Sequence, residues 1–252
     1  MAKAGGTPGK RRGIRLADRE LIELADPRVQ HMPVADCGES LIDVAKSGII
    51  GYGSPPECPE TAPFYRMLRE EVVNRLEKAQ QRLPTGLQFR LYEGFRSPQV
   101  QKMLFDGQLR RARRENPSRD DAWCHAQAAK LASPLCTFEG VEIIPPHSTG
   151  GAVDIEIVDK SGRPLDFGME LSEWDIVPPE RCATEFDGLL DVAVCNRKLL
   201  AETLAAEGFI NYPREWWHFS YGDQYWAFAT GSAKALYGTV QETSCKVRHS
   251  NA

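Results

Sequence analysis

The sequence predicts an α+β fold, with one domain built on a central antiparallel sheet and flanking helices. Helical and alternating apolar patterns follow one another without the regular strand–helix–strand order of a parallel sheet. The 252 residues are 42% hydrophobic and 26% charged, ordinary values for a globular chain that can bury one sizeable core. We therefore expect a single catalytic or binding domain over residues 14–240, between a flexible tail at 1–13 and a second tail at 241–252.

The first half of the domain reads as an irregular arm, a helix and a strand. Residues 36–60 are rich in glycine and proline, and we expect them to lie as an irregular arm over the body. Apolar residues at helical spacing predict a helix over 61–83, with Pro63 in its first turn. Leu87, Phe89 and Leu91 then alternate, which predicts a strand.

Two more helices are expected before the middle of the chain. Ser97 followed by Pro98 is typical of an N-cap and a first-turn proline, so a second helix is predicted through about residue 109. A third helix is predicted over about 120–131. The sequence AVDIEIVD then predicts a strand over 152–159 with an apolar face and an acidic face, half buried and with its acidic face in a cleft or solvent.

The last third is predicted to close the sheet. A loop-rich segment at 159–187 precedes a helix over about 188–207, which Gly208 ends. Residues 209–212 and the segment EWWHFSYGDQYW, which begins at Glu215, read as closing strands on either side of a turn at Pro213.

Composition excludes several classes of function. The formal net charge of −4 gives no electrostatic reason to expect a nucleic-acid partner, and the basic clusters at 10–12 and 110–114 read as a solvated tail and a solvated helix face. No apolar run approaches the ~18 residues needed to span a bilayer, so no membrane partner is expected. The N-terminus lacks the apolar segment of a secretory signal, and the seven cysteines show no CxxC pair, which together predict a cytoplasmic protein.

Two histidines stand out because of their neighbours. His147 follows two prolines and precedes the turn-forming STGG sequence, which can bring it back beside Asp154 on the acidic face of the strand. Glu215 and His218 lie in an aromatic run, whose walls lower the local dielectric constant. Two imidazoles and one carboxylate with an open fourth position suit a catalytic zinc, and a further carboxylate could act as general base. Each signal alone is weak, because a His near an Asp is more often a structural pair.

In combination, HSTGGAVD, EWWH and the earlier EGFRS resemble the zinc D-alanyl-D-alanine dipeptidases of the vancomycin-resistance type. More broadly they resemble the superfamily of D-Ala-D-Ala carboxypeptidases and Hedgehog-like folds. The resemblance runs from about residue 33 to 228. It implies a zinc metallopeptidase that cleaves D-Ala-D-Ala or a similar small dipeptide, with one Zn²⁺ per chain. It also implies a place in peptidoglycan and cell-wall chemistry.

The resemblance assigns roles to individual residues. It implies that His147, Asp154 and His218 bind zinc, that Glu215 is the catalytic base, and that Arg96 stabilises the oxyanion. Taken alone, Arg96 reads as a surface ion pair with Glu93. In an ideal strand Glu215 and His218 face opposite sides, so a shared site requires a bend at Glu215-Trp216.

The substrate pocket departs from the family pattern. Pro145 replaces a serine two residues before the first ligand, and the acidic residue expected to receive the substrate amine falls at or near Ser172. Glu170, Glu173 and Asp175 are candidates to replace it, of which Glu173 is the best choice. The other residues expected to contact the substrate are Ser148 and Trp217, beside the ligands.

Two alternative functions remain open. One is a cell-wall D,D-carboxypeptidase or endopeptidase of the same superfamily, which a signal peptide or a wall-binding repeat would favour. The other is a non-catalytic, zinc-stabilised binding module. A structural zinc site needs neither an off-metal base nor an oxyanion partner, so Glu215 and Arg96 favour an enzyme.

Overall fold

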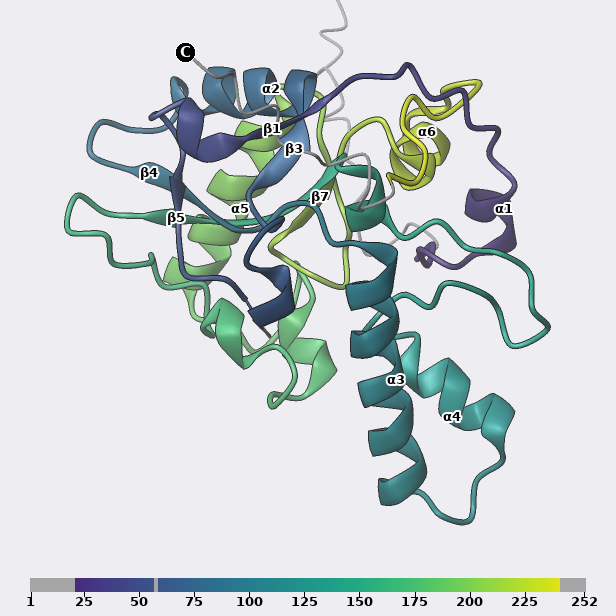
Figure 1. Cartoon of the computed structure of the whole chain (residues 1–252). Helices are drawn as coiled ribbons and strands as arrows, with labels where there is room; N and C mark the ends of the chain where they lie inside the picture. Colours follow the sequence, from purple (N-terminus) through teal and green to yellow (C-terminus); the bar gives the residue numbers. More distant parts are fainter. Residues whose placement is uncertain (1–20, 57–58, 241–252) are drawn as a thin grey trace, which may run out of the picture.

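The computed structural model describes residues 21–56 and 59–240, so the predicted tails at 1–13 and 241–252 lie outside it. The α+β prediction is confirmed. Among the described residues one five-stranded sheet has the order β2 (Gly51–Tyr52), β4 (Gln88–Glu93), β5 (Ala152–Val158), β7 (His218–Ser220) and β6 (Ile210–Asn211). All neighbours are antiparallel except β2 and β4 at the edge, which are parallel. β5 is therefore the central strand (Figure 1).

Two helices, α2 (Glu70–Gln80) and α5 (Asp191–Ala205), pack on the apolar side of the sheet. Ile155 and its alternate neighbours on β5 share the core cluster with Leu76 of α2 and Leu204 of α5. Because side chains alternate along a strand, Asp154 and Glu156 face the other side. The functional groups of β5 thus lie on the face that α2 and α5 leave uncovered.

The central strand is more deeply buried than its pattern predicted. We expected β5 to be half buried, but each of its seven residues is buried. Glu156 accepts hydrogen bonds from Arg90 Nε and Nη2 on β4, at 2.9 and 2.7 Å, and Asp154 lies among imidazoles. Each acidic side chain therefore has its own cationic or hydrogen-bonding partner, which makes its burial possible.

The prediction of a helix over 61–83 was wrong for its first part. Helix α2 begins only at Glu70, and residues 67–69 form strand β3, which pairs with β1 (Leu41–Asp43). The carbonyls of Tyr65 and Met67 accept hydrogen bonds from the backbone of Gly94 and Phe95. These long-range contacts hold residues 65–69 out of the helix, although their apolar spacing suits one.

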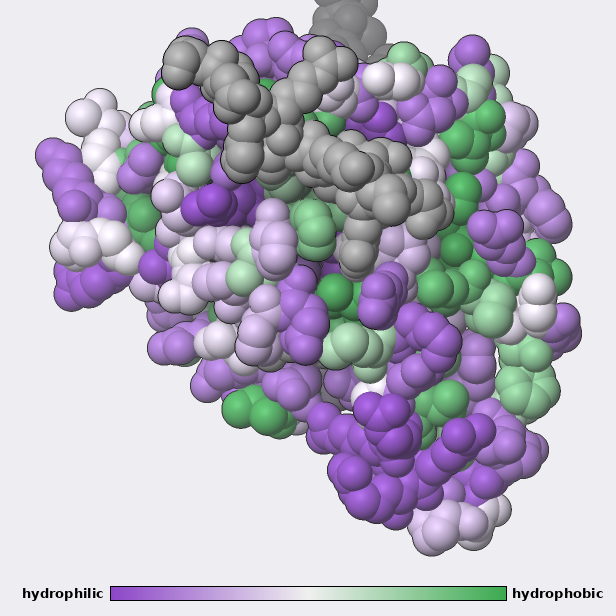
Figure 2. All heavy atoms as spheres, viewed as in Figure 1, coloured by the Kyte–Doolittle hydropathy of each residue, from purple (hydrophilic) through white to green (hydrophobic). Residues whose placement is uncertain are grey.

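The predicted starting points of the next two helices are confirmed. Ser97 caps α3 (Pro98–Glu115), and Asp120 caps α4 (Asp121–Ala128). The two form a hairpin that extends from the body (Figure 1). Its far end is strongly hydrophilic (Figure 2), and there Arg111 and Arg113 pair with Glu115 and Asp121.

The end of the chain only partly follows the strand prediction. Strands β6 and β7 form, but Gln224–Thr230 is a helix, α6, because the Asp223 side chain accepts a hydrogen bond from Trp226 N and caps it. A short helix near the start, α1 (Pro27–Gln30), lies beside α6. Within the described part of the chain, the helices are too short or too polar to cross a bilayer.

Candidate active site

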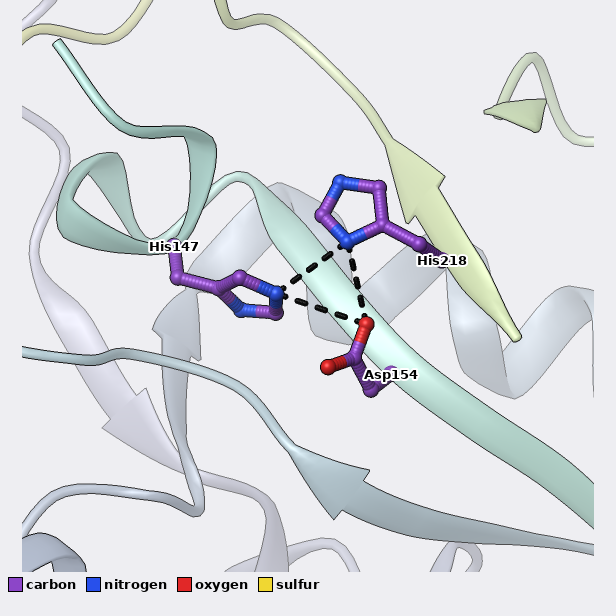
Figure 3. Close-up of side chains that lie close together, drawn as sticks. All are labelled: His147, Asp154 and His218. Atoms are coloured by element: carbon purple, nitrogen blue, oxygen red, sulfur yellow. Dashed lines mark hydrogen bonds and ion pairs between the residues drawn. The ribbon is translucent and has the colours of Figure 1, made fainter. Parts of the chain in front are cut away.

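Three buried side chains converge on the face of the sheet opposite α2 and α5 (Figure 3). His218 Nδ1 lies 3.0 Å from Asp154 Oδ1, and His147 Nε2 lies 3.3 Å from the same oxygen. The two imidazole nitrogens are 3.1 Å apart. All three candidate ligand atoms lie within 4.8 Å of one another. The structure thus brings together the three residues predicted from the sequence, in a geometry that a single cation could share.

Strand register places two members of this trio. Asp154 on β5 is the direct antiparallel partner of His218 on β7, so both side chains leave the same face of the sheet. Burial alone would raise the pKa of Asp154, but the adjacent His147 and His218 imidazoles lower it well below its ordinary value. Asp154 is therefore an anion at neutral pH, as a metal ligand must be.

His147 reaches the trio from a short 3-10 helix, Pro146–Thr149, that precedes β5. Its Nδ1 donates a hydrogen bond to the Gly94 carbonyl at 2.7 Å, which leaves the Nε2 lone pair directed at Asp154 and His218. A histidine whose other nitrogen donates to a carbonyl has a fixed tautomer and ring orientation, as metal-binding histidines usually do. The EGFRS segment thus supports the first histidine through its backbone.

Gly151 connects this helix to β5 and packs against Tyr221, the residue that follows β7. A Cβ at Gly151 would lie 2.4 Å from the Tyr221 carbonyl oxygen, and Gly151 O accepts a hydrogen bond from Tyr221 N. Gly151→Ala is therefore expected to push β5 and β7 apart and to lower the free energy of unfolding by about 1–3 kcal/mol. Thermal or denaturant unfolding measures the loss. Gly53→Ala is the control, because its Cβ would meet nothing within 4 Å, and an equal loss there would contradict the steric explanation.

Glu215 lies on a turn before β7 rather than on the strand. Its backbone N–H donates to the Tyr212 carbonyl, and His218 N donates to the Glu215 carbonyl. This turn is the bend that the sequence required, and it brings Glu215 Oε2 to 3.8 Å from His218 Nδ1. The Glu215 side chain keeps 22% of its surface exposed, whereas that of His218 keeps 2%. Glu215 therefore borders the trio and still faces the cavity.

The environment of Glu215 suits a group that exchanges protons. Burial, helped by the Asp154 charge, raises the pKa of Glu215 to about 7 against the lowering effects of His218 and Arg96. In metal-free protein Glu215 should therefore titrate near neutrality, and Asp154→Asn should lower its pKa by removing a negative charge. Carboxyl NMR titration of the two proteins tests this. An ordinary pKa in the wild type, or no change on substitution, would contradict it.

If Glu215 acts as a general base, activity should be lost as pH falls through its pKa, because a general base must be ionised. A cation in the site favours the ionised carboxylate. The acidic limb of the pH–rate profile should therefore lie below the pKa measured without metal.

Arg96 lines the same cavity. Its ion pair with Glu93 is not on the surface, as the sequence alone suggested, but in the interior. Its guanidinium bonds both oxygens of Glu93, whose side chain is fully buried, and Nη1 donates to Gln101 Oε1 at 2.9 Å. Glu93 is the β4 partner of Asp154, so the pair lies directly beside the trio. These contacts fix the orientation of the guanidinium.

The three predicted substrate-binding residues have different positions. Trp217 lines the cavity. Ser148 is fully buried and its hydroxyl donates to the Arg96 carbonyl, so it supports the loop instead of lining the cavity. Glu173 accepts a hydrogen bond from Glu170 N at the start of its own short helix, and the structure does not bring it to the cavity.

Several lining residues carried no recognisable sequence signal. The cavity around the trio measures about 60 Å³, and its wall includes side chains from four separate segments. Leu24 precedes α1, Gln101 and Leu104 lie on α3, Leu131–Ser133 follow α4, and Tyr92 lies on β4. The arm at 36–60, expected to lie over the body, does not line this cavity with any of its described residues. Instead it borders a separate cavity through residues 53–56.

Comparison with known proteins decides the family. A family model described as D-ala-D-ala dipeptidase matches residues 63–235, a range that contains Arg96, the trio and Glu215. The chain belongs to the D-Ala-D-Ala dipeptidase family. It is accordingly a metallopeptidase, and its candidate ligands all fall inside the matched range.

Two D-alanyl-D-alanine dipeptidases agree with this membership. This chain is 27% identical over 239 residues to a D-alanyl-D-alanine dipeptidase of Synechocystis sp. The alignment covers 83% of this chain and 95% of that protein. A D-alanyl-D-alanine dipeptidase of Escherichia coli is 27% identical over 135 residues, 54% of this chain and 55% of its own. The solved structure of VanYB in complex with D-alanine-D-alanine aligns with a TM-score of 0.39 and 17% identity, covering 66% of this chain and 78% of that one.

Proposed function

We propose that this metallopeptidase uses zinc to hydrolyse the peptide bond of D-Ala-D-Ala or a similar small dipeptide. The observation that carries the proposal is the convergence of His147, Asp154 and His218 with Glu215 at their edge. The site's position in the matched range and two curated dipeptidase relatives support the substrate class.

The donor set fits zinc. Two imidazole nitrogens and one carboxylate oxygen form the type of three-ligand set that catalytic zinc uses, with a fourth position left for water or substrate. Asp154 is held ionised, and the Gly94 carbonyl orients His147, so little reorganisation is needed. Bound there, zinc would polarise the scissile carbonyl and lower the pKa of water. We expect one zinc per chain.

The chain's own residues supply the rest of the reaction. Glu215 accepts the proton of the attacking water and returns it to the leaving amine. Arg96, fixed by Glu93 and Gln101, places a positive charge beside the oxygen that becomes negative in the transition state. The small cavity of about 60 Å³ favours a small substrate.

A peptide panel tests the proposal. Zinc-loaded protein is incubated with D,D-, L,D- and L,L-dipeptides, and the released amino acids are measured. Preferred cleavage of D-Ala-D-Ala supports the proposed function, whereas preferred cleavage of longer wall peptides would favour the D,D-carboxypeptidase or endopeptidase alternative. The cytoplasmic location stays a prediction from the sequence.

A further inference from the structure

The segment at residues 21–26, here called the N-terminal strap, crosses the edge of the catalytic cavity although it lies outside the family match at 63–235. Leu24 of the strap lines the cavity together with the trio and Glu215. The family motifs therefore do not make the whole site, and one wall comes from a segment that precedes the matched range.

The strap is attached to the turn that carries Glu215. The Glu23 carboxylate accepts hydrogen bonds from Arg214 Nε at 2.7 and 2.8 Å and from the Tyr212 hydroxyl at 2.6 Å. Gln30 Nε2 on α1 donates to the Leu24 carbonyl at 2.6 Å. An arginine–carboxylate pair reinforced by a buried hydroxyl is directional, so these bonds hold Leu24 at one position against the site.

Leu24 stands between two cavities. The catalytic cavity measures about 60 Å³, and a neighbouring cavity of about 400 Å³, open to solvent, is lined by the strap, the end of α4 and Tyr212. The residues that line both are Leu24, Leu131, Ala132, Ser133 and Glu215. Leu24 and residues 131–133 thus form a partition between the catalytic cavity and this larger space.

The two cavities differ in the catalytic groups that line them. Glu215 lines both, whereas Arg96 lines only the narrow one. In the proposed reaction Glu215 faces the leaving amine and Arg96 faces the carbonyl oxygen, so the larger cavity lies on the leaving-group side.

We propose that Leu24 is a specificity-determining residue, which limits the leaving group of this peptidase to a single small residue by closing the passage to the cavity behind it. The proposal rests on the proposed function for the direction of the substrate. Removing the Leu24 side chain should join the two cavities and admit a leaving group one residue longer.

The experiment compares three peptides and four metal-loaded proteins. D-Ala-D-Ala is the reference, D-Ala-D-Ala-Gly lengthens the leaving group, and N-acetyl-D-Ala-D-Ala lengthens the other end. The proteins are wild type, Leu24→Gly, Leu24→Ala and Ile22→Ala. Ile22 is the matched control, because it packs on the same hydrophobic cluster as Leu24 but lines neither cavity. Mass spectrometry identifies D-Ala-Gly as the product of cleavage at the first bond.

Leu24→Gly is expected to raise the kcat/KM of D-Ala-D-Ala-Gly relative to D-Ala-D-Ala by at least about tenfold, the scale of discrimination that a small change in an apolar pocket gives. Leu24→Ala should give a smaller rise. The kcat/KM of the acetylated peptide relative to D-Ala-D-Ala should not rise. Ile22→Ala should leave the relative kcat/KM of both the tripeptide and the acetylated peptide unchanged. An unchanged ratio in Leu24→Gly, or an equal rise for the acetylated peptide, would overturn the proposal.

Binding measurements separate this proposal from the proposed function. Calorimetry with Glu215→Gln and with Glu215→Gln/Leu24→Gly compares the affinities of the dipeptide and the tripeptide without turnover. A smaller gap between the two affinities in the double variant supports the partition, and an equal gap contradicts it. Failure of wild-type protein to cleave any of the three peptides would count against the proposed function instead.

Discussion

Alanine in place of His147, Asp154 or His218 is expected to abolish stoichiometric zinc binding. Each substitution removes one of three donors that converge within 4.8 Å, and the two that remain cannot complete a tetrahedral site. The loss of affinity should exceed the ~10–100-fold that follows when a ligand loses only its hydrogen-bond partner. Metal analysis of purified, dialysed protein measures the zinc content per chain.

Glu156→Gln is the matched control for this series. Glu156 lies on the same strand and the same face as Asp154, and it is also buried, but its carboxylate is bound to Arg90. This variant should retain zinc. Full zinc occupancy in all three alanine variants would show that the trio is not the metal site.

Glu215→Gln should separate catalysis from metal binding. Glutamine preserves the size of the side chain but cannot accept the proton, so kcat/KM should fall by about 10²–10⁴-fold while zinc content stays near that of wild type. The side chain lies 3.8 Å from His218 Nδ1, at the edge of the trio. Peptide hydrolysis and metal content are measured on the same samples. Zinc loss as severe as in His218→Ala would make Glu215 a ligand and leave the base unidentified.

The convergence of the trio was predictable because its signals are local or fixed by register. His147 and Asp154 are seven positions apart on either side of a glycine turn, and the alternation of β5 places Asp154 opposite the core. The pairing of Asp154 with His218 follows once the two strands are adjacent. The resemblance supplied that adjacency, since no short-range pattern could have joined segments 64 positions apart.

Other features depend on contacts that a pattern cannot show. Residues 65–69 suit a helix by spacing, but hydrogen bonds from Gly94 and Phe95 hold them extended. Glu173 was chosen from the acidic residues of one loop, yet its carboxylate bonds the backbone of that loop. Leu24 is one apolar residue in a short segment near the N-terminus, and only the fold brings it to the catalytic cavity.

The arrangement of the trio also bears on how the chain resists unfolding. The donor atoms belong to the loop before β5, to β5 itself and to the first residue of β7, so a cation bound by all three would close a chain loop spanning 71 positions between His147 and His218. A cross-link of that span restricts the unfolded chain much as a disulfide does. Since a ligand that binds only the folded state stabilises it by mass action, the unfolding temperature should rise with free zinc concentration. A chelator that removes the cation should therefore lower the unfolding temperature.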